Sequence, residues 1–550
     1  MTRMVRSFSR RALTAWAVLC AVACGGRPDT WDVPFDPGYS PGQSGGPSTG
    51  PQVAGLTGSM AVLDPAQHQV LMLTSPRVRT LETQRLPVGR DVVQFKSSAA
   101  RDRLFVLSRG VTPRYRDGDE PPQLRVFDGG IEPRELAAYE LQDPYEQLEI
   151  DAQGEWLIVH GSRGLVSNPN ELILIRPDRD ERVPASKALD SHGGKPVGFE
   201  FTGPLAIPGG DPRRLLVVRR ERDLAILDLE DLSAPEITVG LPRRADGTYA
   251  TPGQVASHPG VPGEVGSMLA VQLLGDSNVF ILTLGAASDD RHAFGLEANL
   301  VDVGGVPSKL DFVQTRKDGG LRLAALVPDK KAAKLIDPAS STVQDVPLPA
   351  AFRDLRRITD AVSASSGQDI ALLYGNDTNV IAFWQLGTTT GTPYRSIDAY
   401  EIGIKVADVR DIPGPDFADR KILASSLNGA VQQFYVLDLT ARKSFPLDVL
   451  TNLTLGLSPD GQRLWAFNDD ERGFAQLTFD PLQPASLYTQ EPVSYVNDFA
   501  TEKGGGRSAV ALHFLPSRGH SSLAATLFDG AQPSTAETKF VSHLEWEGLK

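Results

Sequence analysis

Hydrophobic and polar positions alternate along this chain in short runs rather than in long periodic stretches. From about residue 55 onward, runs rich in Val, Ile, Leu and aromatic residues are bounded by Gly, Pro, Asp and Asn, and a sustained period of 3.6 residues is almost absent. Such runs are typical of β-strands joined by turns. In the clearest example, LSPDGQRLWAFND at residues 457–469, a Pro-Asp-Gly turn joins two apolar runs. This stretch predicts a β-hairpin within an all-β fold.

The same turn-then-strand pattern recurs along the chain. One apolar residue near the start of the second run marks each copy, and the mean step between these markers is about 49 residues. A repeat of this length is in the range of propeller blades. The ten markers are Val70, Leu104, Trp156, Leu215, Leu269, Leu323, Ile370, Ile422, Leu464 and Val510.

A third strand follows most of these hairpins and ends in Asp plus a turn residue. Six carboxylates at matching phase could form a ring that holds a metal or catalyses a reaction. Asp also ends strands for a simpler reason, because its side chain accepts hydrogen bonds from the backbone amides that follow it. We interpret these residues as turn formers. They are Asp128, Asp228, Asp337, Asp438, Asp480 and Asp529.

A hairpin, a third strand and room for a fourth in each copy predict a β-propeller of four-stranded blades. The combination of SPDG, an apolar strand and a strand ending in Asp resembles the YVTN and PD40-like propeller repeats. That resemblance covers roughly residues 55–550 and implies a propeller region at residues 54–550. Ten copies exceed the usual four to eight blades. One large ring, two smaller propellers, or one ring with a few misread hairpins would all accommodate them.

The N-terminal segment predicts export. Four arginines and no acidic residue precede an apolar run from Ala12 to Ala23, which is too short to span a bilayer but suits a secretory signal. The sequence AVACGG resembles the lipobox of bacterial lipoproteins. This resemblance implies a signal peptide at residues 1–23 and a mature N-terminus at Cys24 that carries an acyl chain such as palmitate. Ordinary cleavage after Ala23 would instead release a soluble protein. Because Cys20 and Cys24 are the only cysteines, we favour lipidation.

Residues 24–53 form a segment dense in Pro, Gly and Ser. Such a segment cannot bury enough apolar surface to offset the entropy lost on ordering. We therefore expect a lipidated N-terminus followed by a flexible linker, with a reach on the order of 30 Å.

The charge of the chain argues against nucleic acid as a partner. The net charge is −13, and removal of the N-terminal segment with its four arginines leaves −17. Such a surface repels phosphate backbones. One arginine-rich stretch at residues 211–223 interleaves its cations with acids, and we interpret it as a mixed charged face. It contains Arg213, Arg214, Arg219, Arg220 and Arg222.

Motifs for chemistry are sparse. None of the eight histidines has zinc-ligand spacing, no nucleophile elbow occurs, and we expect no catalytic or cofactor-binding residues. Calcium is the one metal with candidate ligands, because oxygen ligands clustered in a turn can hold it, although the twelve-position spacing of strong sites is missing. The first candidate turn offers Asp117, Asp119 and Glu120. The second offers Asn468, Asp469, Asp470 and Glu471.

The anchor, the linker and the lack of a convergent catalytic set favour a binding module over an enzyme. We expect an exported lipoprotein, held to a membrane through acylated Cys24, whose propeller binds an envelope protein or glycan. Gly25 and Gly26 follow that cysteine, and by analogy with lipoproteins the missing Asp at the first position favours the outer membrane. The alternative is an envelope enzyme of lactonase, lyase or hydrolase type, with an acidic, calcium-dependent site at the centre of the ring.

Overall fold

The fold is described from a computed structural model. It describes residues 52–347, except for breaks at 78–79, 112, 114–115, 117, 162–163, 179–183, 245, 260–265, 288–290, 315–320 and 331, and from residue 355 onward the strands up to Val541. All of these residues belong to one compact unit, Pro37–Lys550.

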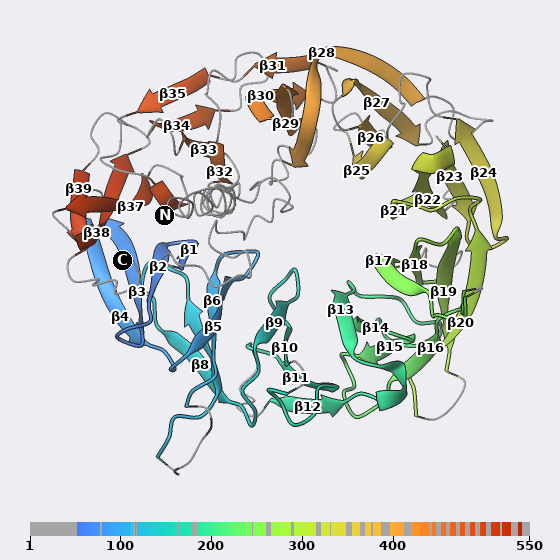
Figure 1. Cartoon of the computed structure of the whole chain (residues 1–550), viewed down its shortest axis with the longest axis horizontal. Coiled ribbons are helices and arrows are strands. Elements are labelled where there is room, and N and C mark those ends of the chain that lie inside the picture. The colour runs from blue at the N-terminus through green and yellow to red at the C-terminus, as the bar shows by residue number, and fades with distance from the viewer. Residues whose placement is uncertain are drawn as a thin grey trace, which may run out of the picture. The chain divides into compact units, whose positions relative to one another are not determined.

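The described strands form antiparallel meanders, in which each strand pairs with the next one along the chain (Figure 1). We number these sheets as blades in chain order. Blade 1 contains β1 (Val53–Gly55), β2 (Ser59–Asp64), β3 (Gln69–Arg77) and β4 (Thr80–Pro87). Blade 2 contains β5 (Val92–Ser97), β6 (Arg103–Ser108), β7 (Gln123–Asp128) and β8 (Glu135–Glu140). Blade 3 contains β9 (Gln147–Ile150), β10 (Leu157–His160), β11 (Glu171–Ile175) and β12 (Ala185–Ala188).

The next three blades follow the same order, with two short 3-10 helices in their connections. Blade 4 contains β13 (Pro196–Phe201), β14 (Leu215–Arg220), β15 (Asp223–Asp228) and β16 (Ile237–Gly240). Blade 5 contains β17 (Thr251–His258), β18 (Met268–Leu274), β19 (Asn278–Ala286) and β20 (Phe294–Asp302). Blade 6 contains β21 (Lys309–Gln314), β22 (Leu321–Val327), β23 (Ala332–Asp337) and β24 (Thr342–Pro347). The helices are η1 (Ser191–Gly193), before blade 4, and η2 (Pro328–Lys330), within blade 6.

Blades 7 and 8 share one long strand. The first part of β28 (Ile397–Asp411) pairs with β27 and its last part pairs with β29, so a seven-stranded sheet results. Blade 7 contains β25 (Leu355–Ser363), β26 (Asp369–Gly375), β27 (Thr378–Leu386) and the first part of β28. Blade 8 contains the last part of β28, then β29 (Arg420–Leu427), β30 (Ala430–Asp438) and β31 (Lys443–Pro446). Blade 9 contains β32 (Leu453–Leu457), β33 (Arg463–Asn468), β34 (Gly473–Thr478) and β35 (Ala485–Thr489). Blade 10 contains β36 (Val496–Thr501), β37 (Ser508–Ser517), β38 (His520–Asp529) and β39 (Glu537–Val541).

The described strands thus make ten four-stranded blades, and the predicted all-β propeller with about ten repeats is confirmed. First strands of consecutive blades contact each other, as β5 does with β1 and with β9. The last blade continues this series, because β36 contacts β1 and β2. The first strand is therefore the inner strand of each blade.

The repeat markers match the second strand of their blades, with one correction. Nine of the ten lie in that strand or, for Trp156, immediately before it. Val70 instead lies in β3, the third strand of blade 1. The turn at residues 65–68 connects the second and third strands there, so an apolar run after a turn does not by itself identify which strand follows. The predicted hairpin at residues 457–469 is confirmed by its strands, because Leu457 of β32 pairs with Leu464 of β33.

Apolar side chains on both faces of the blades hold neighbouring blades together. In β14, Leu215 and Val217 enter one core while Leu216 and Val218 enter another. In blades 1 to 6, where the burial of the second strand is described, this strand is buried on both faces and reads as a continuous apolar run instead of an alternating one. We name two of these junctions for later use. Seam 3–4 lies between blades 3 and 4 around Leu216, and seam 4–5 lies between blades 4 and 5 around Leu215.

Candidate functional site

One polar region lies on the inner strands of blades 2 to 4. Lys96 of β5 donates a hydrogen bond of 2.7 Å from Nζ to the Leu148 carbonyl of β9. Next to Leu148, the Glu149 carboxylate lies 3.8 Å from His160 Nε2. Burial alone would raise the pKa of Glu149, but His160 and the Lys96 ammonium outweigh burial and hold this pKa below its usual range. The His160 ring also packs on Phe199 of blade 4, with centroids 4.6 Å apart.

A second carboxylate on these inner strands behaves in the opposite way. Burial raises the pKa of Glu200 in β13, and the positive charge of Arg219 only partly offsets it. Arg219 itself donates from Nη1 to the Gly253 carbonyl of blade 5, at 2.8 Å. Two carboxylates with oppositely shifted pKa values are a pattern that acid–base enzymes use. The neighbouring cations differ, however, because Lys96 acts on Glu149 and Arg219 acts on Glu200.

The second polar region is a pocket of about 220 Å³ at one end of seam 3–4. Trp156 immediately precedes β10, Arg176 follows β11, and Glu230 follows β15. Tyr139 belongs to β8, so the site combines residues of blades 2 and 3 with the turn between β15 and β16 of blade 4. Its lining residues are Tyr139, Trp156, Leu174, Ile175, Arg176, Pro184, Ala185, Leu229, Glu230, Asp231 and Leu232.

An aromatic ring and a cation form one side of the pocket. Trp156 is only 2% exposed because it packs in the core of seam 3–4. The Arg176 guanidinium lies over its ring, with Cζ 4.9 Å from the ring centroid. Such contacts are favourable because the face of the ring carries partial negative charge. Arg176 Nη1 also lies 3.8 Å from Glu230 Oε2, so the cation is held between the ring and a carboxylate.

The turn that carries the acidic residues is held in place by its own hydrogen bonds. The Asp228 carboxylate accepts from the Glu230 amide at 2.9 Å. Asp231 Oδ1 accepts from the Ser233 hydroxyl at 2.6 Å and from the Ser233 amide at 3.0 Å. These bonds lower the pKa of Asp231, with the hydroxyl as the largest cause, so Asp231 is ionised at neutral pH. The pocket therefore has a fixed negative charge on a rigid turn.

Lys187 of β12 joins this turn to blade 3. Its Nζ donates to the Leu232 carbonyl at 3.0 Å and to the Ala234 carbonyl at 2.6 Å. On the opposite wall, burial raises the pKa of Tyr139, and the nearby Asp178 adds to this. Asp178 is itself 2.5 Å from Arg103 Nη2.

Three of the six strand-end aspartates are shown to form turns, as the sequence predicts. Asp128 accepts from the Gly130 amide at 2.8 Å, and Asp228 accepts from Glu230 as described. Asp337 accepts from the amides of Ala339 and Ser340 at 3.0 and 3.3 Å. In these three blades the carboxylate is used by the turn that follows its strand.

The first predicted calcium turn is only partly described. Asp117 lies outside the described residues. Asp119 Oδ2 accepts from the Arg116 amide at 2.9 Å, whereas Glu120 Oε1 accepts from Gln123 Nε2 at 2.6 Å. Glu120 Oε2 also lies 3.7 Å from Arg90 Nε. The two described carboxylates thus have separate partners, and calcium binding by this turn stays a prediction.

Other predicted positions fall largely outside the description. Asn468 ends β33, while residues 469–471 and Cys24 are not described. Among the described residues, no group of three or more His, Cys, Asp or Glu side chains is placed to hold a metal ion. The described part of the chain also contains no helix long and apolar enough to cross a membrane.

The arginine-rich stretch differs from the mixed charged face predicted for it. Arg213 Nη1 lies 3.5 Å from Asp228, and Arg214 pairs with Glu155, so acids do neutralise these cations. Arg220 contradicts the predicted exposed face, because its side chain is fully buried. The sequence does not distinguish it from its neighbours, since strand alternation directs Arg220 into seam 3–4 together with Leu216 and Val218.

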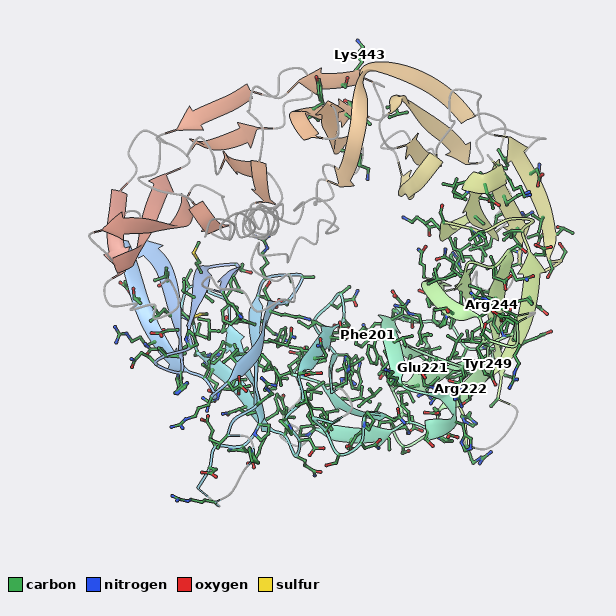
Figure 2. The ribbon with its side chains drawn as sticks, in the orientation of Figure 1. Phe201, Glu221, Arg222, Arg244, Tyr249 and Lys443 are labelled. Carbon is green, nitrogen blue, oxygen red and sulfur yellow. The ribbon has the colours of Figure 1, made fainter. Side chains whose placement is uncertain are left out.

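Arg220 is the centre of a buried ionic network. Its Nε donates to Asp223, and its Nη1 lies 3.0 Å from Glu236 Oε1. Nη1 also donates to the Asp190 carbonyl at 2.7 Å, while the Asp190 amide donates to Glu236 at 3.2 Å. This network fixes the connection before blade 4. In Figure 2 the neighbouring Glu221 and Arg222 lie at the β14–β15 turn, and both are exposed.

The fold defines the class of the protein as an all-β propeller. No protein-family profile and no curated protein matches the chain. Among solved structures, dihydro-heme d1 dehydrogenase NirN in complex with DHE is 13% identical, with 80% of this chain and 75% of that chain covered and a TM-score of 0.37. A putative 6-phosphogluconolactonase from Bacteroides fragilis NCTC 9343 is 11% identical, with 72% and 97% covered and a TM-score of 0.31. The β-propeller domain of Cps50 (Swd1) from Myceliophteria thermophila is 10% identical, with 70% and 94% covered and a TM-score of 0.28. The likeness is one of fold alone, and nothing about ligand or reaction follows from it.

Proposed function

We propose that the protein is an exported lipoprotein, anchored through Cys24 to the outer membrane, whose propeller binds a protein or glycan of the cell envelope. The binding contact is the pocket of seam 3–4. A propeller blade supplies rigid strand ends, and binding sites are commonly built where such ends meet.

The observation that supports this proposal is the composition of the pocket. It joins an apolar wall to a held cation, Arg176, and to two acidic residues on a braced turn, Glu230 and Asp231. Apolar surface with a few fixed polar groups is typical of recognition sites, because the apolar part gives affinity and the polar part fixes orientation.

The anchor is tested separately from the pocket. In a diderm bacterial host fed labelled palmitate, we expect the full chain to take up label and to sediment with outer membranes. The Cys24→Ser variant is expected to lose both properties. Equal labelling and equal membrane association of the two proteins would overturn the anchor.

The binding contact is tested by photo-crosslinking in intact cells of the native host. A benzophenone amino acid at Pro235, on the exposed rim of the turn, is expected to give a discrete crosslinked product. The matched control is the same amino acid at Leu300, which is exposed on the outer strand of blade 5. Absence of a product from position 235, or the same products from both positions, would contradict a binding site at seam 3–4.

A second candidate is an envelope enzyme of lactonase, lyase or hydrolase type. The inner-strand carboxylates favour it, because the pKa of Glu149 is lowered while that of Glu200 is raised. It predicts turnover of lactones or polysaccharides that falls in Glu200→Gln and in Glu149→Gln, and that chelation of calcium reduces. Turnover that neither variant changes would remove this candidate.

A further inference from the structure

The pocket of seam 3–4 already holds cations that belong to the protein. Arg176 occupies the face of Trp156 and meets Glu230. On the same turn, Lys187 places its ammonium against the carbonyls of Leu232 and Ala234. Arg176 ends on the Glu230 carboxylate, and Lys187 ends on two backbone carbonyls. The turn between β15 and β16 is thus an acceptor for basic side chains.

The two acidic residues of this turn retain acceptor capacity. Glu230 is one-third exposed, and the oxygen that faces Arg176 is Oε2. Asp231 is exposed, and the two hydrogen bonds that it receives from Ser233 both end on Oδ1. Glu230 Oε1 and Asp231 Oδ2 are therefore the atoms through which the pocket would meet a ligand. Of the residues that line the pocket, Arg176 carries the one positive charge against Glu230 and Asp231, so the lining keeps one net negative charge. The Lys187 ammonium lies outside this lining, on the carbonyls of Leu232 and Ala234.

Other ligand classes fit the pocket less well. A sugar ring needs an open aromatic face to stack on, but Trp156 is nearly buried and Arg176 covers it. A volume of about 220 Å³ is below the usual range for cofactors and small-molecule ligands, and it suits a single side chain. A phosphate or carboxylate ligand would meet the repulsion of Asp231 and Glu230.

We propose that this pocket receives a lysine or arginine side chain from a protein segment of the cell envelope. Its ammonium or guanidinium group meets Glu230 and Asp231, and its aliphatic stem packs on Leu229, Leu232 and Pro184. This inference rests on the proposed binding function and selects protein over glycan as the partner.

A positional hexapeptide library tests the inference on the purified full chain. We expect enrichment of Lys or Arg at one position and binding that weakens as salt rises from about 50 mM to about 500 mM. In the double variant Glu230→Gln/Asp231→Asn, affinity for the selected peptide is expected to fall about tenfold or more, because charge-assisted hydrogen bonds are lost. Both replacements keep the shape of the side chain and an oxygen acceptor.

The matched control is Glu221→Gln, an exposed carboxylate at the opposite end of β15 (Figure 2). It is expected to bind the peptide as the wild type does, and all proteins should show the same circular dichroism and the same unfolding midpoint. Selection of acidic or purely apolar peptides, or equal affinity in the double variant, would overturn the inference and leave the binding function standing. A glycan crosslinked at position 235 would likewise overturn the inference and leave the binding function standing. Failure of the proposed binding function would be seen as the absence of any crosslinked product from position 235.

Discussion

Seam 3–4 and seam 4–5 lie on the two faces of blade 4, yet the loops at their ends carry different residues. Seam 4–5 continues into its loops with apolar residues, because Leu205 and Ile207 cover it from the β13–β14 connection and Leu241 and Ala250 from the β16–β17 connection. Seam 3–4 has charged residues beyond its core, with the Arg220 network in one place and the Arg176–Glu230 pair in another. The strands are equivalent, so the difference between the two seams lies in the residues of their loops.

The largest expected effect concerns the buried charge of seam 3–4. Replacing Arg220 by Met leaves Asp223 and Glu236 buried without their cation, and we expect a loss of about 3–5 kcal/mol in the free energy of unfolding. Denaturant unfolding followed by circular dichroism measures it. Arg222→Met, two positions further along the chain and exposed, should change stability by less than about 0.5 kcal/mol. Similar midpoints for both variants would contradict a structural role for the network.

The apolar seam should respond nearly as strongly. Leu269→Ala removes a fully buried side chain from seam 4–5 and is expected to cost about 3 kcal/mol, because it removes apolar contacts and leaves a cavity. Leu300→Ala, with its side chain 46% exposed, should cost less than about 0.5 kcal/mol. If the two substitutions had equal effects in the same unfolding assay, the seam would not be the source of stability.

A smaller effect is expected for the cation on Trp156. A double-mutant cycle of Arg176→Gln and Trp156→Leu should give a coupling energy of about 0.5–1 kcal/mol. Arg243 and Tyr249 provide a matched pair at 4.7 Å on the connection between blades 4 and 5, where Tyr249 is labelled in Figure 2. Arg243 Nη2 also donates a hydrogen bond of 2.8 Å to Tyr249 Oη, so this cycle is made in a Tyr249→Phe background, which removes the bond and keeps the ring. Arg243 is exposed, so its coupling to the ring should be weaker, and a larger coupling would show that burial does not strengthen the contact.

The smallest effect is a pH dependence at Glu200. Its folded-state pKa is raised by burial, so the native protein loses stability as the pH rises from the usual glutamate range through that raised pKa. Glu200→Gln cannot ionise and should therefore unfold at a higher denaturant concentration than the wild type at about pH 7.5. The difference should shrink as the pH falls below about 4, where Glu200 becomes protonated in both states. A stability difference that grows on acidification would contradict a raised pKa for Glu200.

The sequence predicts the repeat far better than it predicts the site. Each second strand is a run of mostly apolar residues in the sequence, and turn residues separate the runs. Even so, the marker of the first blade is offset by one strand, because the turn before Val70 resembles the others. The sequence distinguishes Trp156 only as a repeat marker.

The pocket could not be derived from the sequence, because its residues come from different blades. Arg176 and Glu230 are 54 positions apart, and no spacing rule connects them. The arginine-rich stretch shows the same limit, since only strand alternation and packing separate buried Arg220 from exposed Arg222.

The difference between the two seams can be measured most directly by photo-crosslinking from one exposed proline at each seam. Pro235 lies in the β15–β16 connection that carries Glu230 and Asp231, and Pro208 lies in the β13–β14 connection that covers seam 4–5. In intact cells, we expect a discrete product from position 235 that Glu230→Gln/Asp231→Asn reduces, and none that depends on these acids from position 208. Equal products from both prolines, unchanged in the double variant, would contradict the assignment of binding to seam 3–4.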